Sequence, residues 1–496
     1  TGGGNLITTT GATFTGNIST AGISSVTAGT SNFVAGVNAG NSITSGGNYN
    51  TVVGDEAGTA LTTGGQNVAV GMNAMVGQTT ASYNVAVGQA ALSANTTGAN
   101  TTAVGWNSLT ANTTGASNTA VGSSALGANT TGGDITALGY NALRFNTTGG
   151  DNVAVGTEAL TANTTGGQNV AVGRQSLKSN TTASNNTALG NYSLFYNTTG
   201  GDNTAVGRSA LEDNTTGSAN TAVGMGSLES NTTGTLSTAI GRDALKSSTT
   251  ANSNTAVGRE ALRDTTTGGE NVAIGLNAMA GNTTGPRNTA IGKQCLQNLT
   301  TGDNNTAIGF MAGYNNNTNA TTTGYGNTLI GTYAHTNAAN TQYANALGQS
   351  IGASGGYTTL GSGGSDIRAS HGSTTWSTVS DERYKKDITT STAGLSFVNE
   401  LRPVTWNYKT LGELPTTFSA YEADSTEVFK NTQTNHGFIA QEVKAVIDNH
   451  SEIKDGFRLW DDREDGSQEV AEAALIPVLV KAIQELSARI EVLEGE

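Results

Sequence analysis

The chain has few of the residues that staple small folds or accompany disorder. Of its 496 residues one is cysteine and four are proline, while 5% are aromatic and 12% are charged. The single cysteine, Cys295, cannot form a disulfide within the chain, so the fold is not stapled in that way. Disordered chains are typically rich in proline and charge. Because both are scarce and 68 residues are glycine, alongside abundant Thr, Asn, Ser and Ala, the composition favours tightly stacked β-structure.

Other absences exclude classes of function. No apolar run approaches the roughly 18 residues of a membrane-spanning helix, so membrane insertion is not expected. The net charge of −14 argues against nucleic acid as a partner, since phosphate binding needs a basic face. The four histidines are scattered and aspartate is sparse in the middle of the chain, so we expect no metal site and no cofactor. Neither a signal peptide nor an initiating Met is present, so we expect a processed or truncated part of a longer protein.

A 17-residue repeat dominates the middle of the chain, with the consensus N-T-A-V-G-x-x-A-L-x-x-N-T-T-G-x-x. Its first glycine recurs at a constant spacing of 17 from Gly54 to Gly309, sixteen times in all. The apolar pair before that glycine predicts one short strand, the Ala-Leu pair after it a second, and the N-T-T-G block a turn. Because a single coil cannot bury its own apolar side chains, the coils must stack into a β-solenoid. Equivalent Asn and Thr side chains are then expected to form ladders along the stack.

The repeat resembles the N-x-x-A-x-G units in the heads of trimeric autotransporter adhesins, over about residues 50–315. Those adhesin repeats are shorter than 17 residues, so the resemblance is one of type. It implies a parallel β-roll in which three chains lie side by side.

Variation within the repeat suggests where function could lie. Cys295 takes the place of a small apolar residue, which predicts a buried hydrophobic side chain rather than a reactive thiol. The position directly after the repeat glycine varies freely, so it forms either a solvated face or a stripe that contacts a carbohydrate or protein receptor. Residues of this kind are Trp106, Tyr140, Arg174, Arg208, Arg242, Lys293 and Phe310.

The composition changes sharply at Ser380. From there to the end the chain holds 12 of the 23 basic and 22 of the 37 acidic residues in under a quarter of its length. We therefore predict four parts. They are a Gly/Thr/Ser-rich fibre shaft or adaptor (1–49), the repeat solenoid (50–315), an irregular solenoid end and distal tip (316–379), and a small domain (380–496). The fold class is mainly β, with a small α/β region that ends in a helix.

Three motifs occur in order after that boundary. They are S-D-E-R-Y-K-K-D-I from residue 380, G-L-S-F-V-N-E-L-R-P-V-T-W-N-Y-K from residue 394, and H-G-F-I-A-Q-E-V from residue 436. Together they resemble the C-terminal intramolecular chaperone of endosialidase-type phage tailspikes and tail fibres, a family of self-cleaving serine peptidases.

The resemblance implies a cut between Val379 and Ser380. The Ser380 hydroxyl would attack the preceding carbonyl, with Lys385 as general base and Asp381 and Arg383 in support. A free lysine has a pKa of about 10.4, so the base would need burial or cationic neighbours to lose its proton at neutral pH. The alternative is that this segment is only a helix start, since Ser at the N-cap followed by acidic residues is common there.

The end of the chain carries a heptad pattern. Isoleucines occupy its a positions and leucines its d positions, namely Ile476, Leu479, Ile483, Leu486, Ile490 and Leu493. This pattern predicts a short coiled coil. Isoleucine at a with leucine at d favours dimers, whereas the family resemblance implies a trimer, which we adopt. The alternative is a lone amphipathic helix packed on its own domain.

These features lead to one functional expectation. We expect a homotrimeric, structural phage tail fibre protein that binds a host surface receptor (glycan or protein) and contacts other virion tail proteins. It would fold in the host cytoplasm and perform a single self-cleavage, without turnover of an external substrate.

Two alternatives belong to other classes of protein. One is a trimeric adhesin of a cell surface or an injection system, with no role in a virion. The other is a glycan-degrading enzyme, which needs a pair of carboxylates in a cleft. Asp243 and Glu260 could stack in neighbouring coils, but nothing in the sequence suggests a cleft, so we do not favour this alternative.

Overall fold

A computed structural model describes residues 28–314, 321–363, 365–373, 376–378, 380, 382–418, 420–450, 453, 459–462 and 468–495. The chain divides into two compact units, Thr1–Val379 and Ser380–Glu496. The predicted fold class is confirmed, since the first unit is a β-solenoid and the second is a small α/β region that ends in a helix.

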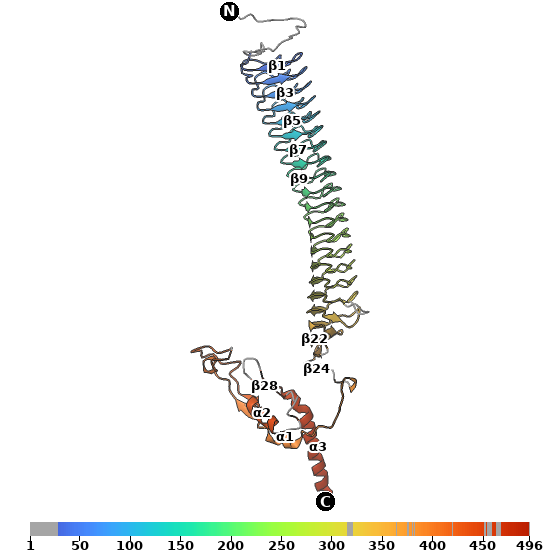
Figure 1. Ribbon diagram of the computed structural model, residues 1–496, viewed down its shortest axis with the longest axis vertical. Coiled ribbons are helices and arrows are strands. Elements are labelled where there is room, and N and C mark those ends of the chain that lie inside the picture. The colour runs from blue at the N-terminus through green and yellow to red at the C-terminus, as the bar shows by residue number, and fades with distance from the viewer. Residues whose placement is uncertain are drawn as a thin grey trace, which may run out of the picture. The chain divides into compact units, whose positions relative to one another are not determined.

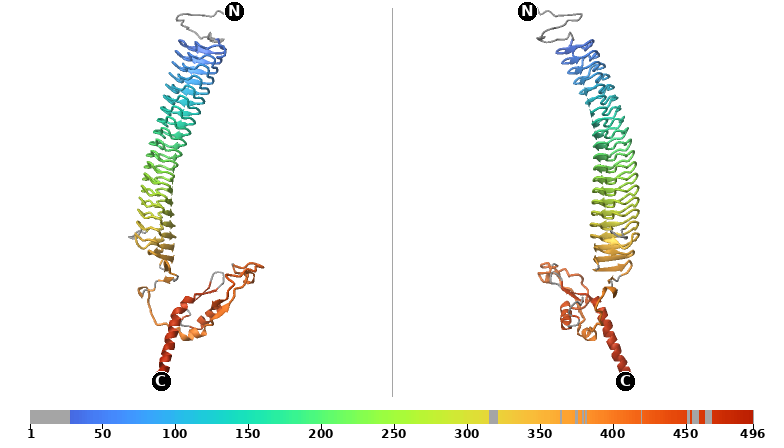
Figure 2. Two further views of the ribbon diagram at one scale, coloured as in Figure 1. Left: turned by 180° about the vertical axis from the view of Figure 1, so that it is seen from behind. Right: turned by 45° about the vertical axis from the view of Figure 1, so that its right-hand side comes forward.

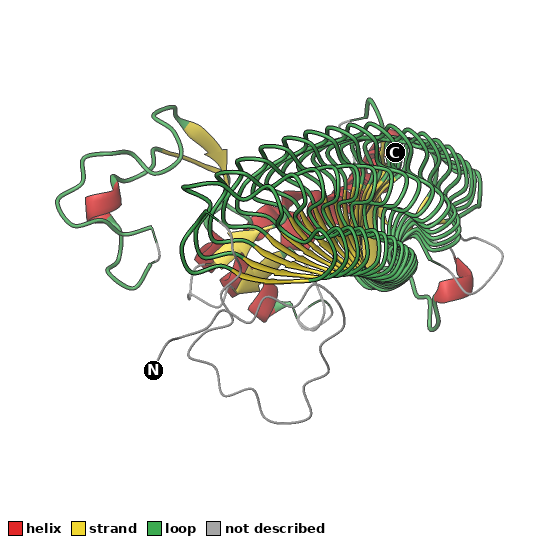
Figure 3. Ribbon diagram, turned by 90° about the horizontal axis from the view of Figure 1, so that it is seen from above, coloured by secondary structure: helices red, strands yellow, loops and turns green. Residues whose placement is uncertain are grey.

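Each coil of the solenoid contributes one three-residue strand, and equivalent residues of successive strands lie opposite each other (Figures 1 and 2). For example, Ala154 pairs with Ala171 in parallel register. Figure 3 shows these strands stacked on one side of the coils, with loops forming the rest. The strands are β1 (Phe33–Ala35), β2 (Thr51–Val53), β3 (Val68–Val70), β4 (Val85–Val87), β5 (Thr102–Val104), β6 (Thr119–Val121), β7 (Thr136–Leu138), β8 (Val153–Val155), β9 (Val170–Val172), β10 (Thr187–Leu189), β11 (Thr204–Val206), β12 (Thr221–Val223), β13 (Thr238–Ile240), β14 (Thr255–Val257), β15 (Val272–Ile274), β16 (Thr289–Ile291), β17 (Thr306–Ile308) and β18 (Thr328–Ile330).

The prediction of a second strand in each coil is wrong. In the coil that begins with β8, Glu158 and Leu160 both adopt left-handed backbone, with φ of 57° and 53°. Left-handed residues at alternate positions turn the chain too sharply for an extended strand. Leu160 is nevertheless fully buried. Such a backbone costs roughly 1–2 kcal/mol for each residue, and burial of a leucine side chain contributes about 1.5–3 kcal/mol, so core packing offsets the cost at Leu160.

The repeat glycine makes close stacking possible. Gly156 has φ of 136°, and a Cβ added there would lie 2.5 Å from the carbonyl oxygen of Gly173 in the next coil. Any larger residue would therefore force neighbouring coils apart. Cys295 is fully buried, and burial raises the pKa of its thiol to about 12, as expected for a structural cysteine.

A buried ladder of asparagines crosses the turns of the solenoid. In the N-T-T-G block each Asn Nδ2 donates to the Oδ1 of the equivalent Asn one coil earlier, at 2.7–3.0 Å. The same Nδ2 also donates to the carbonyl of the glycine three residues later, as Asn163 does to Gly166. We call this the N-T-T-G ladder; it comprises Asn95, Asn112, Asn129, Asn146, Asn163, Asn180, Asn197, Asn214 and Asn231. The predicted side-chain ladders therefore exist for asparagine.

The two ends of the solenoid depart from the repeat. Strand β1 pairs with β2, so the stack extends into the segment that we expected to be a shaft or adaptor; residues 1–27 lie outside the described residues. After β18 come β19 (His335–Thr336), β20 (Asn345–Gln349), β21 (Gly352–Ala353) and β22 (Tyr357–Ser362), followed by β23 (Ser365–Ser370) and β24 (Ser377–Thr378). Because β23 pairs antiparallel with β22, it covers the last strand edge of the parallel stack.

The second unit contains three short 3-10 helices, three α-helices and two small hairpin-like sheets among its described residues. Its elements are η1 (Glu382–Tyr384), α1 (Leu395–Glu400), β25 (Val404–Trp406), η2 (Leu411–Glu413), β26 (Asn435–Gly437), α2 (Ala440–Asn449), β27 (Trp460–Asp462), β28 (Gln468–Val470), η3 (Glu472–Ala474) and α3 (Leu475–Glu494). Strand β25, from the second C-terminal motif, pairs antiparallel with β26, from the third. None of the helices in the described ranges is long and apolar enough to cross a membrane.

Candidate functional site

The side chains of Ser380 and Lys385 meet at the start of the second unit. Lys385 Nζ donates a hydrogen bond to Ser380 Oγ at 2.8 Å. The short helix η1 lies between them, and the backbone N–H of Lys385 donates to the carbonyl of Glu382 at 2.9 Å. This single turn brings residues five apart into contact. A hydroxyl and an amine at this distance are the two groups that a serine–lysine dyad requires.

Both side chains of this pair are exposed in the single chain. A lysine accepts a proton only as the neutral amine, and exposure to water favours the charged form. Arg383 is also exposed and lies within η1. Val379 and Asp381, which we predicted to flank the cut and to support the serine, lie outside the described residues. The geometry therefore supplies the nucleophile and its neighbour, but not the desolvation that would activate them.

Helix α3 has two different faces. Leu475, Val478 and Ala482 are buried against the rest of the unit, in a core that also contains Phe397 of α1. The carboxylate of Glu485 accepts the backbone N–H of Leu395 at 2.9 Å. The contact with that N–H holds the pKa of Glu485 below its ordinary value. No sequence pattern signals this contact, because it joins residues 90 positions apart.

The heptad residues lie on the other face of α3. All six are exposed, from 41% for Leu479 to 72% for Leu493. The helix thus packs on its own unit through one side and leaves an aliphatic stripe, the heptad stripe, open along the other. The alternative of a helix packed on its own domain describes the buried side of α3, whereas the coiled coil along the exposed side stays a prediction.

The solenoid carries a second aliphatic stripe. In β2 to β18 the middle residue of each strand points inward and is buried, while the first and third residues are at least partly exposed. The third residue is Val, Leu or Ile in every one of these strands, and none of them carries a charge. We call these third residues the strand stripe; its most exposed members, Leu138 and Leu189, are each 46% exposed.

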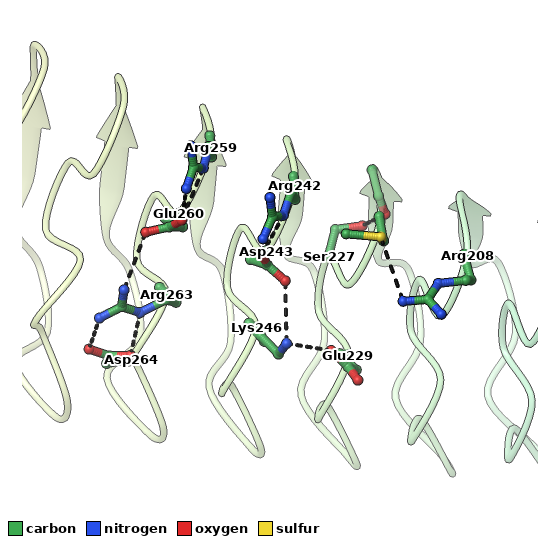
Figure 4. Close-up of polar contacts among 12 residues, drawn as sticks. Arg208, Ser227, Glu229, Arg242, Asp243, Lys246, Arg259, Glu260, Arg263 and Asp264 are labelled. Carbon is green, nitrogen blue, oxygen red and sulfur yellow. Dashed lines mark hydrogen bonds and ion pairs between the residues drawn. The ribbon is translucent and has the colours of Figure 1, made fainter.

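Asp243 and Glu260, the two carboxylates considered for a glycan-degrading site, are each held in ion pairs. Asp243 binds Arg242 at 2.9 Å and Lys246 at 3.3 Å, and Glu260 binds Arg259 and Arg263 (Figure 4). Each carboxylate is neutralised by cations of its own coil. Within the described ranges no group of His, Cys, Asp and Glu is placed to hold a metal ion.

A family model described as a chaperone of endosialidase matches residues 380–452. The match begins at Ser380, the residue at which the second unit begins. No curated protein and no solved structure matches the chain. Solenoid and match together define a fibre-like repeat protein with an intramolecular chaperone at its C-terminal end. The chaperone is of the endosialidase type.

Proposed function

We propose that this protein is a homotrimeric structural component of a phage tail fibre that binds a host surface receptor. Its C-terminal unit would drive trimerisation and folding and then cleave itself off before Ser380. The observation that carries the proposal is that the chaperone match begins at Ser380, whose hydroxyl lies 2.8 Å from Lys385 Nζ.

A chaperone answers a physical problem set by the repeat. Three chains built from near-identical 17-residue coils can associate out of register at little local cost, because a slip of one coil places equivalent residues opposite each other. Chain number and register must therefore be fixed outside the repeat. The exposed heptad stripe of α3 suits this task, because apolar a and d residues at this spacing associate as coiled coils.

The solenoid needs an interface of its own once the C-terminal unit has left. The strand stripe presents one Val, Leu or Ile in each strand from β2 to β18. Burial of this apolar surface against a neighbouring chain contributes about 25 cal/mol per Å². A second copy of this chain matches that stripe in length and in coil spacing. We therefore assign the lateral contacts of the trimer to the strand stripe.

Self-cleavage follows from the dyad in two balanced steps. Ser380 Oγ attacks the carbonyl carbon of residue 379 while its proton passes to a neutral Lys385 Nζ, and the C–N bond breaks as that proton reaches the leaving amine. The resulting ester is hydrolysed by one water, which leaves a carboxylate at residue 379 and a free amine at residue 380. Because Lys385 is exposed in the single chain, we expect assembly to provide the desolvation that favours its neutral form.

Intact-mass measurement on freshly purified protein tests the cleavage. We expect a fragment that starts at residue 380 from the unaltered chain, and an uncut, folded trimer from Ser380→Ala. Lys385→Ala should also stay uncut, whereas Lys386→Ala, at the neighbouring exposed lysine, should be cut normally. A single uncut species after long incubation of the unaltered protein would contradict the dyad. A monomeric or aggregated Ser380→Ala product would implicate the serine in folding instead.

The role of α3 has a separate test. Ile483→Lys places a charge in the heptad stripe and should abolish the trimer, as measured by light scattering. Val492→Lys is the matched control, because Val492 is 66% exposed and lies outside the a and d positions. Equal loss of trimer in both variants would count against a coiled coil. Antibody labelling of virions, as opposed to bacterial surfaces, separates the tail fibre from an adhesin.

A further inference from the structure

From Met72 to Arg208 the residue that follows the repeat glycine alternates in size from coil to coil. Large side chains occur at every second coil, at Met72, Trp106, Tyr140, Arg174 and Arg208. The coils between them carry small or polar residues, at Gln89, Ser123, Thr157 and Asn191. Over this stretch the surface therefore repeats every 34 residues although the fold repeats every 17. We call these large residues the post-strand column. Beyond Arg208 the residue after the repeat glycine is large in every coil, at Met225, Arg242, Arg259, Leu276, Lys293 and Phe310.

The column lies on the surface beside the strand ends. Trp106 is 53% and Tyr140 52% exposed, and Arg208 and Arg242 lie at corresponding places of their coils, directly after the strands (Figure 4). Within the described chain, the side chains of Trp106 and Tyr140 take part in no hydrogen bond or ring contact. They are thus large, flat and unengaged, which is uncommon for aromatic residues that serve only the fold.

The alternation sets a regular distance along the rod. Neighbouring parallel strands are about 4.8 Å apart, so members of the column are about 9.6 Å apart. This is close to the length of one disaccharide in an extended polysaccharide. Each aromatic ring can therefore lie against one sugar of a disaccharide unit. Ser123, between the two rings, is placed to hydrogen-bond the hydroxyls of the other sugar.

We propose that the post-strand column binds an extended acidic polysaccharide that runs along the solenoid. This inference rests on the proposed host-binding function and names the chemistry of the receptor. A globular protein partner typically needs about 800 Å² of buried surface, whereas the column consists of only five side chains. A linear polymer of matching period gains affinity instead from many weak contacts at once.

The acidic character of the polymer follows from the charged part of the column. After Tyr140 it continues with Arg174 and Arg208. Most of the net charge of −14 lies outside the solenoid, because residues 380–496 hold 22 acidic but only 12 basic residues. The Arg174 guanidinium lies over the ring of Tyr192 at 5.6 Å and donates to its hydroxyl at 3.0 Å. These contacts fix its direction. The Arg174 charge also helps to lower the pKa of Glu158, whose carboxylate hydrogen-bonds Gln175 and Lys178. Arginine so placed suits a carboxylate or a phosphate on every second sugar.

Binding of hyaluronan fragments to the assembled protein tests the proposal, because this polymer carries one carboxylate per disaccharide. We expect Trp106→Ala and Tyr140→Ala to weaken binding by about tenfold each. The matched control is Tyr83→Ala, which removes an equally exposed tyrosine (59%) from a position outside the column. Arg174→Gln should weaken binding most at low ionic strength. Neutral cello-oligosaccharides of the same spacing should bind more weakly than hyaluronan.

The two-coil spacing of the post-strand column can be tested without any change in amino-acid composition. The double variant Trp106→Ser, Ser123→Trp keeps one tryptophan but moves it by a single coil, and it should bind as weakly as Trp106→Ala. Equal binding by this variant and the unaltered protein, an equal effect of Tyr83→Ala, or no binding of hyaluronan would overturn the proposal. Adsorption to host cells that is unchanged in the column variants would overturn it and leave the proposed function intact. Failure of trimerisation or cleavage would instead overturn the proposed function and leave the polysaccharide proposal intact.

Discussion

Asn163 lies in the middle of the N-T-T-G ladder, and Asn163→Ala measures what this ladder contributes to the rod. The Nδ2 of Asn163 donates to Asn146 Oδ1 at 2.7 Å and to the Gly166 carbonyl at 2.9 Å, and its Oδ1 accepts from Asn180 Nδ2 at 2.8 Å. All three asparagines are fully buried, so water cannot replace a lost partner.

The loss of stability in Asn163→Ala depends on which buried polar groups lose every hydrogen-bond partner. Gly166 keeps a donor in Asn152, and the Nδ2 of Asn180 keeps the carbonyl of Ala183. Asn146 Oδ1 is left with no partner, and an unsatisfied buried polar group costs about 1–3 kcal/mol. With one unpaired Nδ2 hydrogen on Asn180 in addition, we expect a total near 3 kcal/mol.

One coil of the chain lacks the ladder asparagine, so the reverse substitution can be made there. Ser248 takes the ladder position after Asn231, and both Asn231 Oδ1 and the hydroxyl of Ser248 are buried without a partner among the described residues. The Nδ2 introduced by Ser248→Asn would reach Asn231 Oδ1. We expect this variant to stabilise its coils by about 1 kcal/mol.

Hydrogen exchange of backbone amides on the assembled protein is the assay, because a stack of repeats opens locally rather than as one unit. Protection should fall in the coils around Asn163→Ala and rise around Ser248→Asn. Thr165→Ala, at an exposed position of the same turn, is the control. Exchange that is no faster in Asn163→Ala than in Thr165→Ala would refute the ladder argument.

Three further predictions concern single positions. Gly156→Ala should lower the thermal midpoint sharply, because its Cβ would lie 2.5 Å from the Gly173 carbonyl oxygen; an unchanged midpoint would show that the coils yield. Cys295 should resist iodoacetamide at mildly alkaline pH until denaturant unfolds the protein, because burial raises its thiol pKa to about 12; rapid labelling of folded protein would disprove that burial. The pKa of Glu485 is lowered by the N–H of Leu395, so its stabilisation is present above the ordinary glutamate pKa and is lost as pH falls through the folded-state value. Glu485→Gln should therefore flatten the acid dependence of melting of the C-terminal unit, and an unaltered pH profile would count against the contact.

The candidate site could be predicted in part because its chemistry is local in sequence. Ser380 and Lys385 are five residues apart, and one helical turn is enough to join them. The exposure of the strand stripe could not be predicted. Apolar character alone does not say whether a residue faces the interior of the coil or the surface. The contact of Glu485 with Leu395 could not be predicted from the sequence either, since no sequence pattern links positions so far apart.

The repeat by itself determined that coils stack, how many residues each contains, and that the N-T-T-G block forms a turn, because a single coil of 17 residues cannot bury its own apolar side chains. The pairing of Ser380 with Lys385 could also be predicted from a motif. Only the tertiary structure decided that Leu160 and its equivalents sit in left-handed turns rather than strands, because burial of the side chain outweighs the backbone preference. The tertiary structure also decided that the post-strand column and the heptad stripe of α3 are exposed, since exposure depends on what packs nearby and not on the residue itself.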